Sequence, residues 1–257
     1  MRVVPPPPGF VRARMNVAYD GAPYRGFASN PNVASVQECL ERSLGQVLRH
    51  PIAVTGAGRT DAGVHARAQV VSFDADEARF DPDALRRALN RLLAPTISVD
   101  NIEATAVDFD ARLSCTGRSY RYRIFNRTVP DPLQRHFAWH VRDPLDLEAM
   151  SQATTQILGT HDFRSFSKIN KSRPQQNFER TVRRACWYRC GDLVLFDITA
   201  SAFTHQMVRS LVGMYVAIGR GRRAVSAMGE VLGELSRANA PSPAPSHGLV
   251  LWCAHYD

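Results

Sequence analysis

The stretch IAVTGAGRTDAGVHARAQVVSFD, residues 52–74, decides how the first half of the chain is interpreted. Apolar and β-branched residues at 52–55 and 68–74 predict two strands. Three glycines between the strands predict a loop of tight turns, in which the backbone can approach a ligand closely. We therefore expect two strands joined by a glycine-rich loop that contains Arg59 and Asp61.

Helical patterns flank these two strands. Residues 12–19 predict a strand, and a capping box at Ser35 precedes an amphipathic helix over 36–49. Asp81-Pro82 opens a second helix, and residues 97–107 return as a strand. The resulting order, β-α-β-β-α-β, is that of the split βαβ or ferredoxin-like unit.

The second half of the chain has a similar order of elements. They are predicted as strand 115–126, helix 146–158, strands 180–190 and 193–201, helices 204–219 and about 224–236, and strand 248–256. We therefore expect an α+β fold of two ferredoxin-like halves, with an extended, mostly antiparallel sheet, helices on one side and a cleft between the halves. The expected domains are a flexible proline-rich tail (1–11), an N-terminal half (12–110) and a C-terminal half (111–257).

Composition excludes several classes of protein. Apolar residues make up 44% of the 257 residues, which is typical of a globular chain. No apolar run approaches the roughly 18–20 residues of a membrane span, and the N-terminus lacks the apolar core of a signal peptide, so a cytoplasmic protein without membrane contact is expected. Five cysteines without a C-x-x-C pair predict reduced thiols and no zinc site.

The charge favours a polyanionic partner. The formal net charge is +8, and only Lys168 and Lys171 of the 32 basic residues are lysines. Arginine presents a planar fork of donors that suits phosphate, so an excess of it fits nucleic acid. A biased genome composition would give the same excess, and composition alone does not separate the two explanations.

The residues of the glycine-rich loop alone leave its role open. An aspartate in such a loop most often caps its own turn, so Asp61 has a structural alternative. His65 has no second ligand at metal spacing, and the G-x-x-x-x-G-K-[ST] phosphate-binding motif is absent.

Several ordered motifs in addition to this loop resemble one known family. They are GAGRTDAGVHA (56–66), Tyr19-Asp20-Gly21 with Tyr24 and Gly26, Ser35-Val36-Gln37, Phe109-Asp110-Ala111-Arg112, Ser119-Tyr120-Arg121-Tyr122, Asp162-Phe163 with Ser165-Phe166, Phe203 with Gln206 to Arg209 and Val212-Gly213, and Gly248-Leu249. In this order and spacing, over residues 14–254, the chain resembles the TruA family of tRNA pseudouridine synthases.

The resemblance implies a role for five residues. Asp61 matches the catalytic aspartate, and Arg59 matches a basic residue that helps to hold the flipped-out nucleotide. Tyr120 matches a tyrosine that stacks on the target uracil and takes part in proton removal. Arg209 matches an arginine that pairs with the catalytic carboxylate, and Leu249 an apolar residue of the uracil pocket.

The resemblance also implies a substrate and a partner. We expect isomerisation of uridine at positions 38, 39 or 40 of the tRNA anticodon stem-loop, bound in the cleft between the halves, by a homodimer. The isomerisation gains and loses no atoms, so neither a cofactor nor a metal is expected. Basic residues form three clusters: Arg118, Arg121, Arg123 and Arg127; Lys168, Lys171 and Arg173; and Arg220, Arg222 and Arg223. Each cluster alone is more often a solvated face, but their number and the net charge predict that at least one binds RNA phosphates, with Arg118 and Arg121 as the candidates.

One segment departs from the family pattern, and three other interpretations remain. Where the family usually has Trp-Gln and a further Gln after Gly26, this chain has Phe27-Ala28-Ser29-Asn30, which bears on RNA contacts and on the choice of uridine. The alternatives are a non-catalytic RNA-binding protein, a glycoside hydrolase, which would need a carboxylate pair that the loop does not supply, and a structural interaction module.

Overall fold

The computed structural model describes residues 3–169 and 175–257, and these residues form two compact units. Unit 1 consists of residues 1–116 with 251–257, and unit 2 consists of residues 117–250. Lys171 and Arg173 of the basic clusters lie outside the described residues. In the described part of the chain, no helix is long and apolar enough to cross a membrane.

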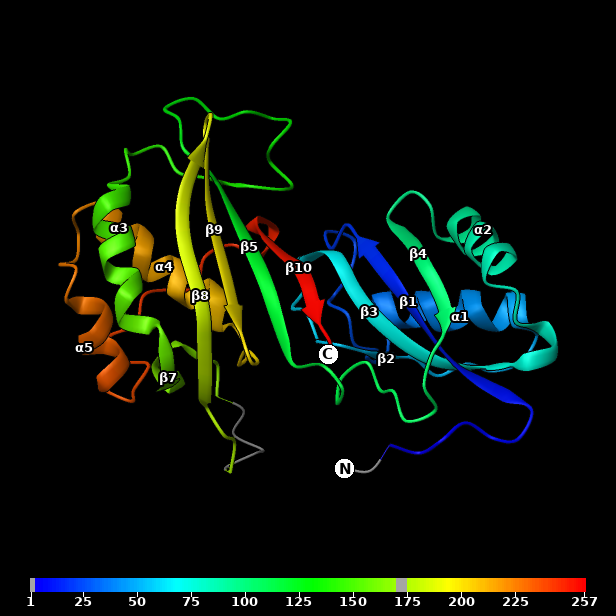
Figure 1. The fold of residues 1–257 in the computed structure, drawn as a ribbon. Helices are drawn as coiled ribbons and strands as arrows, with labels where there is room; N and C mark the ends of the chain where they lie inside the picture. Colours follow the sequence, from blue (N-terminus) through cyan, green and yellow to red (C-terminus); the bar gives the residue numbers. More distant parts are fainter. Residues whose placement is uncertain (1–2, 170–174) are drawn as a thin grey trace. The chain divides into compact units, whose positions relative to one another are not determined.

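Unit 1 has the predicted order of elements. Its elements are β1 (Phe10–Tyr19), α1 (Val36–Leu48), β2 (Thr55–Gly56), β3 (His65–Asp76), α2 (Pro82–Leu93), β4 (Ile97–Ala104) and, from Leu251 on, β10 (Leu249–His255) (Figure 1). β1 pairs antiparallel with β3 and β4, and β2 pairs antiparallel with β3. The order β4-β1-β3-β2 is that of a split βαβ unit, as the sequence predicts.

Local signals set the ends of the two helices of unit 1. The Ser35 hydroxyl accepts a hydrogen bond from Glu38 N at 3.2 Å, and Arg49 ends α1 in the left-handed region with φ 61°. Asp81 accepts from Ala84 N at 3.0 Å, with Pro82 in the first turn of α2. Each helix turns one apolar face to the core, which in α1 includes the buried Leu44.

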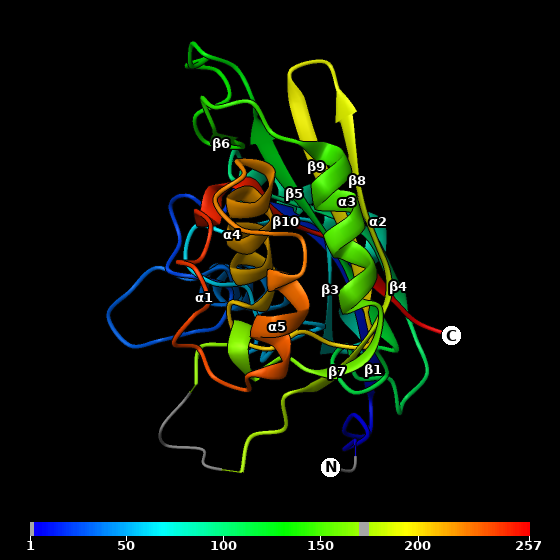
Figure 2. The same cartoon turned by 90° about the vertical axis from the view of Figure 1, so that its left-hand side faces the viewer.

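Unit 2 contains the remaining strands and helices. These are β5 (Gly117–Phe125), β6 (Trp139–His140), α3 (Leu147–Thr154), β7 (Gly159–Asp162), β8 (Glu179–Cys190), β9 (Leu193–Ala200), α4 (Met207–Gly219), α5 (Ala227–Gly233) and the first two residues of β10. The strand order is β5-β9-β8-β7 with antiparallel pairs, and β6 adds a short parallel pair to β5. Helices α3, α4 and α5 lie on one side of this sheet (Figure 2).

Aromatic rings fill the space between the sheet of unit 2 and α4. Trp187 of β8 stacks on Phe196 of β9 with centroids 4.6 Å apart, and Tyr215 of α4 packs against both rings. Directly opposite residues of paired strands share a face, so Tyr122, which is opposite Phe196, belongs to this buried face. Tyr122 is fully buried and is therefore a core residue of this face.

The structure differs from the predicted elements in several places. β1 begins at Phe10, inside the tail expected over 1–11, and β3 begins at His65 rather than at residue 68. Strands β6 and β7 are absent from the prediction because two and four residues are too few for an alternating pattern to be recognised. α4 begins at Met207, three residues later than expected.

Candidate active site

The loop between β2 and β3 is held first by a side chain inside β3. Gln69 is fully buried, and its Nε2 donates to Gly58 O at 2.6 Å. Its Oε1 accepts from Gly58 N at 3.2 Å. One amide side chain therefore satisfies both backbone groups of Gly58 and fixes the start of the loop.

The residue before Asp61 is held just as firmly. The buried Thr60 hydroxyl and the Tyr19 hydroxyl lie 2.9 Å apart in a hydrogen bond, and Phe27 N donates to Thr60 O at 3.1 Å. Gly26 has φ +109°, and a β-carbon there would lie 2.7 Å from Thr60 O, so only glycine fits. The segment that departs from the family pattern, which begins at Phe27, therefore packs directly against the loop that contains Asp61.

The end of the loop rests on the turn after β1. His65 is 3% exposed, and its Nδ1 accepts from Gly21 N at 3.0 Å and lies 3.1 Å from Asp20 Oδ1. A β-carbon at Gly21 would lie 2.1 Å from Val64 O, which explains the glycine. These contacts give His65 a structural role in the loop.

Arg59 and Asp61 lie between these fixed points. Arg59 is exposed and Asp61 is half-buried, and Asp61 O accepts from Val64 N at 3.1 Å to close the turn. A loop pinned at both ends holds the Asp61 side chain in a defined place, as a catalytic group requires.

In unit 2, the two tyrosines of β5 occupy neighbouring positions on one face. Tyr120 is 8% exposed, and its ring meets Phe203 edge-on with centroids 5.0 Å apart. The Tyr122 hydroxyl donates to Pro245 O at 2.8 Å. Burial raises the pKa of Tyr122, while the nearby positive charge of Arg209 acts in the opposite direction.

Arg209 and Leu249 are held by the segment between α5 and β10. Arg209 Nε donates to Ala244 O at 2.8 Å, and Ala244 N donates to Arg209 O at 2.9 Å. Leu249 is 6% exposed and follows Gly248, where a β-carbon would lie 2.7 Å from the Tyr122 ring. Unit 2 thus gathers Arg209 and Leu249 around one segment that also contacts Tyr122.

The two arginines expected to bind phosphate lie on opposite faces of β5, because strand side chains alternate. Arg118 shares the face of Tyr120, and its Nη1 donates to Ser201 O at 3.3 Å. Arg121 faces the other way and forms two 2.7 Å bonds to Asp197, which raise its pKa. The structure therefore groups Arg118, and not Arg121, with Tyr120.

The predicted site residues divide between the two units. Unit 1 supplies Arg59 and Asp61, and unit 2 supplies the other five: Arg118, Tyr120, Arg121, Arg209 and Leu249. The supporting residue that sequence reasoning missed is Gln69; an amide beside Val70 and Val71 in an apolar strand was the available signal.

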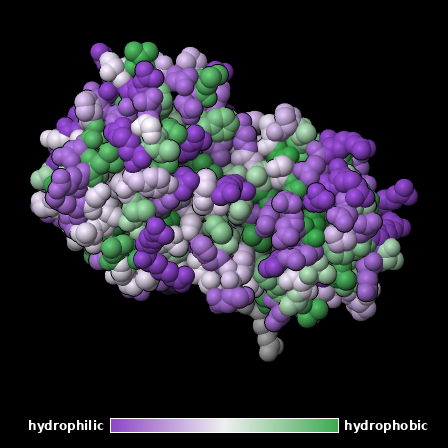
Figure 3. Space-filling view, turned by 45° about the horizontal axis from the view of Figure 1, so that its top comes forward, coloured by the Kyte–Doolittle hydropathy of each residue, from purple (hydrophilic) through white to green (hydrophobic). Residues whose placement is uncertain are grey.

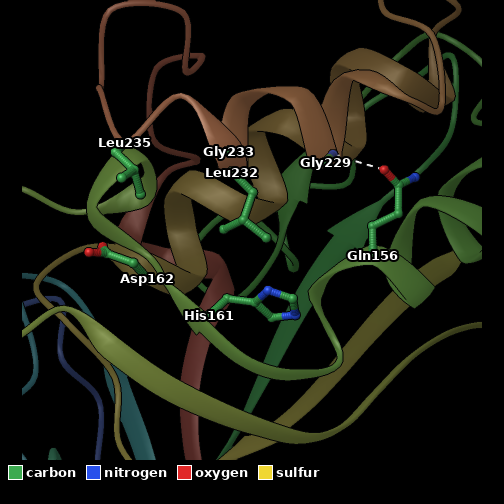
Figure 4. A pocket seen from close by; sticks show the side chains of 7 residues that line it. All are labelled: Gln156, His161, Asp162, Gly229, Leu232, Gly233 and Leu235. Atoms are coloured by element: carbon green, nitrogen blue, oxygen red, sulfur yellow. Dashed lines mark hydrogen bonds between the residues drawn. The ribbon is translucent and has the colours of Figure 1, made fainter.

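A hollow of about 400 Å³ elsewhere in unit 2 contains none of these residues. Gln156, His161, Asp162, Gly229, Leu232, Gly233 and Leu235 line it (Figure 4). The polar groups drawn have partners within the unit: Gln156 Oε1 accepts from Gly229 N, His161 Nε2 lies 2.8 Å from Leu158 O, and Asp162 pairs with Arg164. Among residues 3–169 and 175–257, no three His, Cys, Asp or Glu side chains form a group that could hold a metal ion.

Comparison with known proteins defines the class to which this fold and loop belong. Residues 15–113 and 153–257 match the family model described as tRNA pseudouridine synthase. The chain therefore belongs to the tRNA pseudouridine synthase family.

Individual relatives agree over nearly the whole chain. The tRNA pseudouridine synthase A of Halalkalibacterium halodurans is 39% identical over 93% of this chain and 90% of its own. The protein of the same name from Moorella thermoacetica is 39% identical over 95% and 98%, and that from Myxococcus xanthus is 40% identical over 93% and 90%. The family resemblance expected from the sequence is thereby confirmed.

Proposed function

We propose that this chain isomerises uridine to pseudouridine in the tRNA anticodon stem-loop, at positions 38, 39 or 40, with Asp61 as the catalytic carboxylate. The observation that supports this most is the loop around Asp61, which is clamped at Gly58 and at Thr60 while Asp61 itself stays half-buried. Membership of the tRNA pseudouridine synthase family supports the substrate class.

The reaction breaks the N1–C1′ bond, turns the uracil and joins C5 to C1′. The proton leaves C5 and a proton ends on N1, so atoms and charge balance without a further reactant. In this proposal the ionised Asp61 either attacks C1′ or accepts the proton at C2′. In this proposal Arg209 pairs with the carboxylate of Asp61, as the family resemblance implies.

A uridine in a stem must leave the base stack before it can react. Extruding it costs a few kcal/mol, and stacking on an aromatic ring returns about 1–3 kcal/mol. We assign this stacking to Tyr120, whose hydroxyl is also suited to proton transfer, and the apolar contact to the uracil to Leu249. These two assignments are supported by the position of Tyr120 and Leu249 in unit 2, where both side chains have little exposed surface.

The remaining groups of the proposal bind the RNA backbone. Arg59 is exposed beside Asp61, and Arg118 lies on the Tyr120 face of β5. Arg121 would have to exchange its bonds to Asp197 for a phosphate, so we expect it to contribute least of the three. The homodimer and the cytoplasmic location implied by the resemblance belong to the same proposal, and light scattering of the purified protein would measure the oligomer.

Incubation of the purified protein with unmodified tRNA transcripts and with isolated anticodon stem-loops tests the activity. We expect pseudouridine to form without added metal or nucleotide, and mapping of the modified positions then identifies the target uridines. Tight binding of the same RNA without any pseudouridine would replace the proposal by a non-catalytic RNA-binding protein on this scaffold.

A further inference from the structure

A second arginine lies near Arg118 on the Tyr120 face of the unit 2 sheet. Arg180 is in β8, two residues before Val182, which is opposite Ala200 of β9, and Ala200 is opposite Arg118 of β5. Residues opposite each other or two apart along a strand share a face. Arg180, Arg118 and Tyr120 therefore share one face of three paired strands.

The guanidinium of Arg180 is poorly satisfied by the described protein groups. Its Nη1 donates to Glu179 O at 2.5 Å, while its Nε is buried and lacks a hydrogen-bond partner among the residues that the structure describes. A buried donor without a partner costs free energy, more so in a charged group. Burial and then the positive charge of Arg118 lower the pKa of Arg180.

Two nearby guanidinium groups repel each other unless an anion lies between them. Along β5, Arg118 is two residues from Tyr120, or about 7 Å at the rise of a strand. Both side chains reach the connection from β9 to α4, Arg118 at Ser201 O and Tyr120 at Phe203. An anion bound by Arg180 and Arg118 would therefore lie next to the ring assigned to the uracil.

We propose that Arg180, together with Arg118, binds a backbone phosphate of the RNA next to the target uridine. This inference rests on the proposed function and adds Arg180 to its binding groups. Arginine suits the task because its planar fork can bind two phosphate oxygens at once. The phosphate would supply the missing acceptor for Arg180 Nε and offset the repulsion from Arg118.

The test compares Arg180→Gln with Arg184→Gln, a matched change in the same strand. Arg184 is exposed and lies opposite Thr199, on the other face of the sheet. For the anticodon stem-loop, Arg180→Gln is expected to raise KM about tenfold or more with a much smaller change in kcat, since a charged hydrogen bond is lost. Arg180→Gln should also make the plot of log binding constant against log salt concentration less steep by about one. This slope is measured with the pseudouridine-containing product stem-loop.

Neutral methylphosphonate groups, placed one at a time beside the target uridine, locate the contact. One replacement should weaken binding to the wild-type protein and to Arg184→Gln, but not weaken binding to Arg180→Gln any further. Arg180→Lys, which keeps the charge, should keep the salt slope. If thermal melting shows that Arg180→Gln is unfolded, the comparison with the methylphosphonate RNAs is made with Arg180→Lys instead. Equal behaviour of Arg180→Gln and Arg184→Gln in an active enzyme would overturn this inference alone, whereas an inactive wild-type protein would overturn the proposed function.

Discussion

At the scale of single residues, buried polar side chains place the loop that contains Asp61. Gln69 bonds both backbone groups of Gly58, and Tyr19 bonds the Thr60 hydroxyl. Gln69, Tyr19 and Thr60 are not among the residues proposed to contact the RNA, yet the position of Asp61 depends on them because they hold its neighbours in the loop. Removal of one partner of such a buried bond costs about 1–3 kcal/mol.

We expect Gln69→Leu to lower the free energy of unfolding by about 1–3 kcal/mol, because Gly58 N and O lose their partner. Turnover should fall as well, since the loop is no longer held. Urea unfolding and single-turnover rates measure the two effects. Gln152→Leu is the matched control, because Gln152 is exposed on α3 and should leave both quantities unchanged; equal effects of the two changes would contradict the role of Gln69.

Buried tyrosines predict how stability depends on pH. Burial raises the pKa of Tyr122 above the ordinary value of 10.0, so this hydroxyl stays protonated in the folded chain when it ionises in the unfolded one. Its contribution is therefore complete below about pH 10 and is lost as the pH rises further. Tyr122→Phe should cost about 1 kcal/mol at pH 8 by removing the bond to Pro245 O, and should make the loss above pH 10 less steep. Urea unfolding between pH 8 and 10.5 checks both; an unchanged steepness would contradict the assignment.

At the scale of elements, long and strongly patterned segments were predictable. The helices α1 and α2 follow from their caps and apolar faces, and the hairpin of β8 and β9 follows from the predicted strands 180–190 and 193–201, which the turn residues Gly191-Asp192 separate. The short strands β6 and β7 were not predictable, because pairing with a neighbour rather than local sequence defines them. For the same reason the sequence did not reveal that Asp197 holds Arg121, a contact between residues 76 positions apart.

The packing of α4 gives a prediction at this scale. A β-carbon on Gly213 would lie 2.4 Å from Ser242 O, in the segment that also contacts Arg209 and Leu249. Gly213→Ala should therefore destabilise the protein by about 1–3 kcal/mol and reduce turnover, because α4 must move away from that segment. Gly233→Ala in α5, where nothing lies within 4 Å, is the matched control and should be neutral or slightly stabilising. Thermal melting and activity of both variants test this; a harmless Gly213→Ala would be inconsistent with the described packing.

At the scale of the whole molecule, basic residues outnumber acidic ones. The chain carries a formal net charge of +8, and hydrophilic residues cover most of the face drawn in Figure 3, with hydrophobic residues interspersed in small groups. Composition was compatible with a polyanionic partner but did not separate it from a biased genome composition, and the family to which the chain belongs supports tRNA as that partner. The boundary predicted at residue 110 already separates Arg59 and Asp61 from the other site residues.

This charge predicts that RNA binding depends strongly on salt. Each phosphate neutralised by an arginine releases counterions, so the logarithm of the binding constant should fall linearly with the logarithm of salt concentration, with a slope set by the number of contacts. Filter binding of a tRNA transcript between 50 and 300 mM salt measures the slope. A binding constant independent of salt would mean that the arginines of this chain do not contact phosphates.

The most direct test of the account concerns the carboxylate of Asp61. In Asp61→Asn, the loop should keep its shape and the side chain almost its volume. The variant loses the negative charge that the proposal places at the sugar of the target uridine. Single-turnover assays should therefore detect no pseudouridine, while the same protein binds the anticodon stem-loop as tightly as the wild type. Retained turnover, or loss of binding together with turnover, would contradict the assignment of Asp61 as the catalytic group.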